Sequence, residues 1–146
     1  GIVTADCLPV LLVDPARRAV AAAHAGWRGT VAGVAAAAVQ ALLDRGSEAG
    51  DLLAALGPSI GPCCYEVGEE VASEFDESLL RPGFSAKPHL DLWEAVLGRL
   101  VGTGIEERRI SLARLCTSCH PEWFASHRRD AGTTERMASL IVSAGS

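Results

Sequence analysis

The sequence has few aromatic residues, no block of like charge and no apolar run of membrane-spanning length. Aromatic residues make up 5% of the 146 positions, whereas apolar residues make up 49%, so a core would be packed mainly from small side chains. The net charge is −5 and the basic residues do not cluster, which argues against nucleic-acid binding. Charged and polar side chains interrupt the longest apolar stretch, which argues against a membrane-spanning helix: Arg17, Arg18, His24 and Arg28.

The sequence also lacks a basic-then-apolar signal segment at its start, and it enters an apolar stretch almost at Gly1. We therefore expect residues 1–146 to form a single domain that lacks its N-terminal part. The number of cysteines is odd, at 5, in a chain able to build an ordinary core. This argues against a disulfide framework and predicts a cytoplasmic protein.

The order of apolar runs and turn residues predicts an α+β fold, a layered sandwich of mixed β-sheet with flanking helices. Asp91, with Glu94 three residues later, forms a capping box, and Thr30 is a fair N-cap. Helices are predicted over 31–45, about 67–75 and 92–102, and strands over 8–13, 18–24, 52–57, 109–115 and 136–143.

The first two apolar runs are separated by DPAR at 14–17, which predicts a β-hairpin. With this turn, Val13 faces Arg18, Val10 faces Ala21 and Cys7 faces His24. Directly opposite residues have Cβ atoms about 4.5–5.5 Å apart, close enough for a thiolate and an imidazole to share a zinc ion. A buried cysteine beside a hydrogen-bonded histidine would also explain the pattern.

His24 is followed by a glycine-flanked arginine and then by a predicted helix, which together are typical of an anion site. Arg28, Gly29 and Thr30 are therefore candidate phosphate-binding residues, with Arg28 as a forked donor. A plain strand-to-helix turn, in which Trp27 packs, is the other interpretation.

Five ordered motifs cover nearly the whole chain: TADCLPV at 4–10, HAGWRGT at 24–30, GPSIGPCCYEVG at 57–68, HLDLW at 89–93 and RRD at 128–130. In these motifs the chain resembles the YfiH-like, or laccase-domain, family of purine nucleoside phosphorylases. Two positions depart from the family pattern: His127 replaces an aromatic residue, and Glu135 replaces a glycine.

The resemblance implies a YfiH-like fold and a zinc-dependent enzyme that cleaves adenosine, inosine or methylthioadenosine with phosphate. Adenosine deamination is a further implied activity. Copper-dependent polyphenol oxidation and editing of peptidoglycan precursors are alternatives. The implied partners are a purine nucleoside and phosphate, with no nucleic acid and no membrane.

The family's metal site has one cysteine and two histidines, and Cys7 and His24 match two of the three. The third would lie upstream of Gly1, so we expect this chain alone to be poorly active. Asp6 is a candidate proton carrier or a support for Cys7, and it is equally plausible as a turn residue. Arg128 and Arg129 either line the substrate pocket or form a solvated basic patch.

Two competing interpretations concern the remaining cysteines. Residues 116–120 read CTSCH, the attachment pattern of haem c, which would indicate an electron-transfer protein. Cys116 and Cys119 could instead build a structural zinc module with His120 or His127. Neighbouring Cys63 and Cys64 are not expected to point at one metal together, so this second site is the weaker prediction.

Overall fold

A computed structural model describes residues 1–83, 85–131 and 134–143. Its centre is a four-stranded sheet in the order β3-β2-β4-β7. These strands are β2 (Leu8–Asp14), β3 (Ala19–Ala25), β4 (Leu53–Leu56) and β7 (Ile110–Leu112). β2 pairs antiparallel with β3 and β4, whereas β4 and β7 are parallel. The sheet is therefore mixed, and the predicted α+β class is confirmed.

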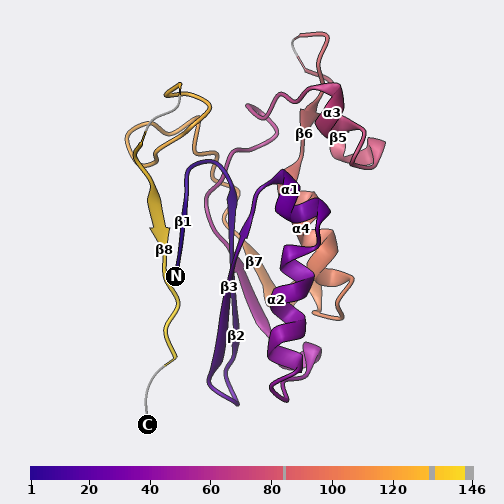
Figure 1. Cartoon of the computed structure of the whole chain (residues 1–146), viewed down its shortest axis with the longest axis vertical. Coiled ribbons are helices and arrows are strands. Elements are labelled where there is room, and N and C mark those ends of the chain that lie inside the picture. The colour runs from indigo at the N-terminus through magenta and orange to yellow at the C-terminus, as the bar shows by residue number, and fades with distance from the viewer. Residues whose placement is uncertain (84, 132–133, 144–146) are drawn as a thin grey trace.

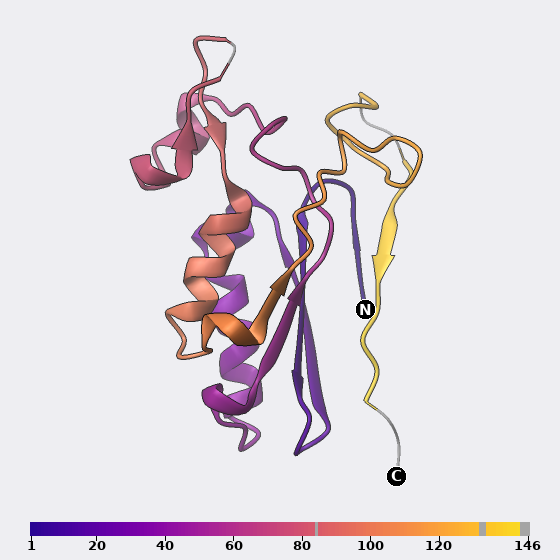
Figure 2. The same cartoon turned by 180° about the vertical axis from the view of Figure 1, so that it is seen from behind.

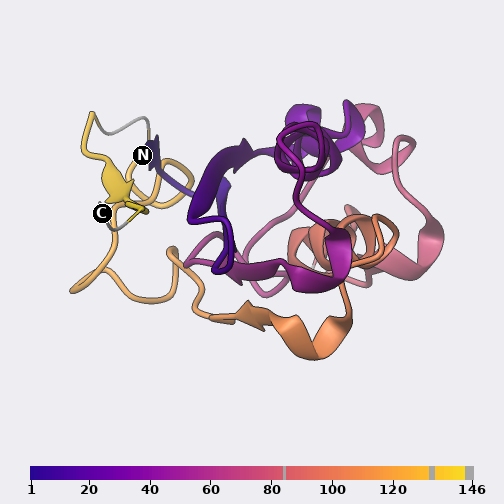
Figure 3. The same cartoon turned by 90° about the horizontal axis from the view of Figure 1, so that it is seen from below.

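The sheet lies between a helical layer and a two-stranded ribbon (Figures 1 to 3). The helices on one side are α1 (Trp27–Val31), α2 (Val34–Leu43) and α4 (Leu92–Val101), and α2 packs against β3 and α4. The ribbon on the other side pairs β1 (Ile2–Thr4) with β8 (Met137–Ser139). Alternate residues of β2 share one buried core with α2 and α4, namely Leu8, Val10 and Leu12, each 0% exposed. One face of the hairpin is therefore buried in the core.

The register of the β2–β3 hairpin corrects the prediction made for it. Leu8 pairs with Ala25 and Pro9 with His24, so Cys7 does not lie opposite His24. The reason is that Asp14 belongs to the strand: its buried carboxylate accepts hydrogen bonds from the amides of Ala16 and Arg17, each at 2.9 Å. The turn therefore moves one residue along the chain, from 14–17 to 15–18. The partner of each β2 residue shifts by two, so that Val13 pairs with Val20 instead of Arg18. Cys7 itself precedes β2 and takes no part in the ladder, whereas His24 belongs to β3.

The predicted helix over 31–45 is two helices. α1 begins at Trp27, with Gly26 before it, and Gly33 separates it from α2 with a left-handed φ of 80°. Thr30 is not an N-cap: its hydroxyl lies inside α1 and donates to the carbonyl of Gly26 at 2.9 Å. The predicted stop at Gly46 is confirmed, because this residue has a φ of 94° just after α2.

The Asp91 capping box is half formed. Asp91 Oδ1 accepts from the amide of Glu94 at 3.2 Å, and α4 begins at Leu92 as predicted. The Glu94 carboxylate instead binds Arg114, at 2.7 Å.

The remaining elements are short. They are η1 (Ala49–Asp51), α3 (Glu69–Ala72), η2 (Glu77–Leu79), β5 (Leu80–Arg81), β6 (His89–Leu90) and η3 (Glu107–Arg109). The predictions for 67–75, 109–115 and 136–143 therefore locate an element each but overestimate its length. Among the described residues, no helix combines the length and apolar character that crossing a membrane requires.

Candidate functional site

A cavity of about 180 Å³ lies at the end of the hairpin that carries the N-terminus of β2. Its lining combines apolar surface with a thiol, a phenol and charged groups: Ala5, Asp6, Cys7, Ile60, Tyr65, Leu92, His127 and Arg128. Three of the residues singled out from the sequence, Asp6, Cys7 and Arg128, thus meet at one cavity. A concave apolar site with a few convergent polar groups is the usual form of a small-molecule site.

Cys7 lies just before β2 and is half-buried beside Gly26. A Cβ on Gly26 would sit 2.8 Å from the Cys7 sulfur, so the glycine leaves room that no other residue would leave. Burial raises the pKa of the Cys7 thiol, and the nearby Asp6 carboxylate raises it further. The thiol is therefore protonated at neutral pH unless a cation replaces the proton.

His24 is exposed near the end of β3, and Arg28 is exposed at the second residue of α1. The Arg28 guanidinium stacks over the Trp27 ring, with its carbon 4.3 Å from the ring centre. Gly29 packs close to the carbonyl of His24, and Thr30 is buried, with its hydroxyl bound to Gly26. Of this predicted phosphate-binding group, Arg28 is the side chain that reaches solvent with a charge.

Asp6 is buried in the left-handed conformation, with a φ of 77°. One carboxylate oxygen accepts from the hydroxyl of Thr117 at 2.6 Å, and the other accepts from the amide of Arg128 at 2.7 Å. Its carbonyl also accepts from the amide of Ile60 at 2.9 Å. Asp6 therefore ties three distant segments together next to Cys7.

Arg128 lies over the ring of Tyr65, and both side chains line the cavity. Its guanidinium donates to the carbonyl of Glu66 at 2.8 Å, and its carbon lies 5.5 Å from the centre of the Tyr65 ring. Burial is the main cause that raises the pKa of Tyr65 to about 12, and the neighbouring thiol of Cys7 adds to it. The Tyr65 hydroxyl is thus a hydrogen-bond donor throughout the neutral range.

Arg129 points into the protein rather than into the cavity. Its guanidinium donates to the carbonyls of Thr117 and Phe124, each at 2.8 Å, and pairs with Asp130 at 2.7 Å. These contacts hold the loop that carries Arg128.

The cavity wall also contains four residues for which the sequence predicted no role, namely Ile60, Tyr65, Leu92 and His127. Three of these lie in or beside the motifs at 57–68 and 89–93, which was the available signal, whereas His127 was noted as a departure from the family pattern.

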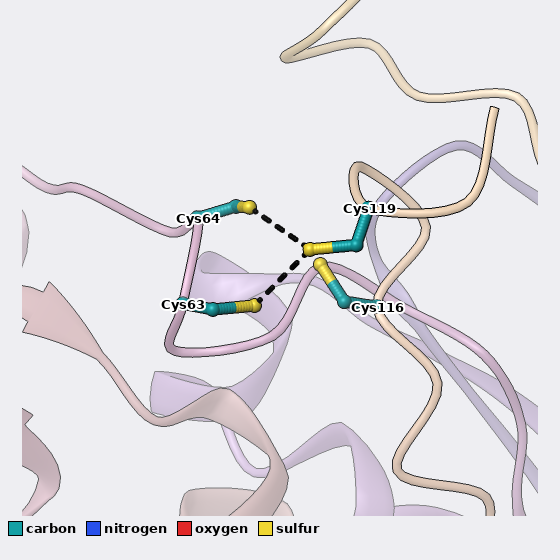
Figure 4. A group of neighbouring side chains, drawn as sticks. All are labelled: Cys63, Cys64, Cys116 and Cys119. Carbon is teal, nitrogen blue, oxygen red and sulfur yellow. Dashed lines mark hydrogen bonds between the residues drawn. The ribbon is translucent and has the colours of Figure 1, made fainter.

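A group of four thiols, two of them in the predicted structural zinc module, lies outside the lining of the Cys7 cavity. Cys63, Cys64, Cys116 and Cys119 place their sulfur atoms within 4.8 Å of one another, and this cluster could hold a metal ion (Figure 4). The expectation that Cys63 and Cys64 would not face one metal together is therefore wrong. His120 instead stacks on Trp123, with ring centres 5.3 Å apart, and pairs with Glu122.

The mixed sheet and its helical layer define an α+β protein, in which the Cys7 cavity is the candidate site. Residues 1–144 match the family described as multi-copper polyphenol oxidoreductase laccase, and the chain belongs to that family. It is 40% identical over 148 residues to the purine nucleoside phosphorylase YlmD of Geobacillus stearothermophilus, a match that covers 94% of the chain and 53% of that protein.

Two further relatives extend this result. The chain is 38% identical over 136 residues to the adenosine deaminase RL5 of an unknown prokaryotic organism, with 88% of the chain and 52% of that protein covered. A crystal structure of a Neisseria meningitidis protein superimposes with a TM-score of 0.88 at 37% identity, over 99% of the chain and 60% of that structure. The chain thus spans little more than half the length of these relatives.

Proposed function

We propose that this chain carries most of the active site of a zinc-dependent purine nucleoside phosphorylase, which cleaves adenosine, inosine or methylthioadenosine with phosphate. The observation that carries the proposal is the cavity where Cys7, Tyr65 and Arg128 meet, in a chain similar to a purine nucleoside phosphorylase over 94% of its length. The cavity is smaller than the roughly 300–1,000 Å³ of complete small-molecule pockets. It suits one part of a nucleoside rather than the whole molecule.

Cys7 and His24 are the residues of this chain that would hold the zinc ion. The donor set fits, because a thiolate and an imidazole are preferred zinc ligands, and Cys7 and His24 both lie at the same end of the hairpin. The space beside the Cys7 sulfur fits as well, because Gly26 places no side chain there. When bound, zinc would supply a Lewis acid at the edge of the cavity.

The chain's own groups would bind and orient the substrates. Arg28 would bind phosphate, because an exposed guanidinium offers two parallel donors to an oxyanion. Tyr65 and Arg128 would position the nucleoside, with the protonated phenol as a donor to its polar atoms. Asp6 would hold Cys7 and Arg128 in place, since both of its carboxylate oxygens already accept hydrogen bonds. Arg129 would act through the same loop.

Adenosine deamination is a second candidate activity, favoured by the 38% identity to an adenosine deaminase. The two reactions give different products. Phosphorolysis yields a free purine base and a sugar phosphate only when phosphate is present, whereas deamination yields inosine and ammonia without phosphate.

The test is an assay of the complete protein with adenosine, with and without phosphate, alongside a polyphenol substrate. We expect base release that depends on phosphate, and a loss of at least about 100-fold in kcat/KM in Cys7→Ser, because even groups that only support a metal ligand contribute 10- to 100-fold. Unchanged zinc content and activity in Cys7→Ser would refute the metal assignment. Polyphenol oxidation without base release would favour a copper enzyme instead.

Arg28→Gln tests the phosphate site. Loss of a charged hydrogen bond costs about 1.5–3 kcal/mol, so kcat/KM for phosphate should fall about 10- to 100-fold. Arg108→Gln is the matched control, because Arg108 is also exposed but pairs with Glu106 on the surface, away from the cavity. Equal kinetics in the two variants would remove Arg28 from the site.

A further inference from the structure

Four cysteines outside the Cys7 cavity converge from two loops far apart in the sequence. Cys63 and Cys64 follow β4, and Cys116 and Cys119 follow β7 (Figure 4). The Cys119 sulfur lies 3.5 Å from the sulfur of Cys63 and 3.5 Å from that of Cys64. All four sulfur atoms lie within 4.8 Å of one another.

The backbone brings these loops together. β4 and β7 are parallel, so the chain leaves both strands at the same edge of the sheet. The pairing continues beyond the strands, where the amide of Ser59 donates to the carbonyl of Leu115 at 3.2 Å and the amide of Thr117 donates to the carbonyl of Ser59 at 3.0 Å. A tight turn then places Cys119 over Cys116, with the Cys119 amide donating to the Cys116 carbonyl at 3.2 Å.

The cluster has the dimensions of a tetrahedral thiolate site. Zinc–sulfur bonds of about 2.3 Å place the sulfur atoms of such a site about 3.8 Å apart. The observed separations of 3.5 Å, with an upper limit of 4.8 Å, bracket that value. The amide of Gly61 also donates to the buried sulfur of Cys116 at 3.3 Å, and such a donor stabilises a thiolate.

Binding of a metal requires the four thiols to lose their protons. A divalent cation held among the sulfur atoms takes the place of these protons, which pass to solvent.

We propose that Cys63, Cys64, Cys116 and Cys119 bind one zinc ion in a closed, structural site that is separate from the Cys7 centre. With four thiolates the coordination sphere is complete, so this zinc has no open position for substrate. The soft sulfur ligands select zinc over magnesium, calcium or manganese.

This zinc braces the wall of the cavity. Tyr65, which lines the cavity, follows Cys64 directly, and Thr117, whose hydroxyl donates to Asp6, follows Cys116 directly. Arg128 contacts the same loop through the carbonyls of Cys64 and Glu66. The ion therefore fixes the two loops that position the cavity residues.

The test compares the zinc content of the complete protein, purified without oxygen, with that of three variants. Cys119→Ser and Cys63→Ser alter exposed ligands of the cluster, whereas Cys7→Ser alters the separate Cys7 centre and should keep the zinc of the cluster. Each cluster variant should lose about one equivalent of zinc per chain and show a lower Tm. After cobalt substitution, Cys7→Ser should keep the intense thiolate-to-cobalt absorption of a site with four sulfur ligands, and Cys119→Ser should lose it.

Alkylation of the wild-type protein decides the matter even if the cluster variants do not fold. The four thiols should resist alkylation in the native protein and become reactive after a strong chelator removes the zinc. Free alkylation before chelation, or disulfides among these cysteines in the anaerobic protein, would overturn the proposal. A Cys7→Ser variant with unchanged zinc content would count against the Cys7 centre and leave this site standing, so the two failures are distinguishable.

Discussion

At Gly26, the absence of a side chain decides how much room the Cys7 thiol has. The two residues lie close together just beyond the last pair of the β2–β3 ladder, Leu8 with Ala25. The backbone of Gly26 is extended, with a φ of −77°, so any residue could adopt its conformation. The requirement for glycine here is therefore one of space at the thiol.

Gly26→Ala should lower zinc content and kcat/KM by about 10- to 100-fold, because the new Cβ would lie 2.8 Å from the Cys7 sulfur and displace it. Gly98→Ala is the control: Gly98 lies within α4 with no atom near its Cβ position, and the change should stabilise the protein by about 0.5–1 kcal/mol. Metal analysis and steady-state kinetics of both variants measure the difference. Full activity in Gly26→Ala would place the Cys7 sulfur outside the reaction.

At the scale of elements, α4 forms one wall of the cavity through Leu92, and its first turn depends on Asp91. The buried Asp91 carboxylate caps the helix and also accepts two hydrogen bonds from Arg81, at 2.7 and 3.2 Å. One side chain thus connects the start of α4 to β5.

Asp91→Ala should lower the free energy of unfolding by about 1–3 kcal/mol, because it removes a helix cap and a charged hydrogen bond together. Asp44→Ala is the matched control at the opposite end of a helix, since Asp44 follows α2 and is exposed. That change should stay within about 0.5 kcal/mol. Urea unfolding of both variants measures the effect, and equal losses would contradict the role of the cap.

At the scale of the whole molecule, stability should depend on pH at both extremes. The Arg129 guanidinium lowers the pKa of Asp130 from 3.8, so the folded state binds this proton less readily than the unfolded state. The contribution of Asp130 is thus fully present above pH 3.8 and is lost as the pH falls through the folded value. Burial raises the pKa of Tyr65 from 10.0 to about 12, so its contribution is present below pH 10.0 and is lost as the pH rises toward 12.

Urea unfolding as a function of pH tests both parts of the stability curve, the acidic limb and the alkaline limb. Asp130→Asn should flatten the acidic limb, because the amide does not titrate there, and Tyr65→Phe should flatten the alkaline limb. Each variant serves as the control for the other, since the two groups titrate in separate ranges. Limbs of wild-type slope in the variants would assign the pH dependence to other groups.

The sequence by itself determined where the hairpin strands lie and where α4 begins. The apolar runs at 8–13 and 18–24, the cap at Asp91 and the stop at Gly46 are local signals, and the structure confirms each of them. Such local signals do not determine which residues pair across the hairpin, because Val13 pairs with Val20 and the prediction was wrong by two residues.

Only the tertiary structure decided the register and the cysteine cluster. The register depended on where Asp14 was buried, and the turn followed from that burial. The cluster depended on the parallel pairing of β4 with β7, two strands more than fifty residues apart, which no local pattern reveals. Spacing along the chain reports the geometry of neighbours, whereas contacts between distant segments are set by how the sheet is assembled.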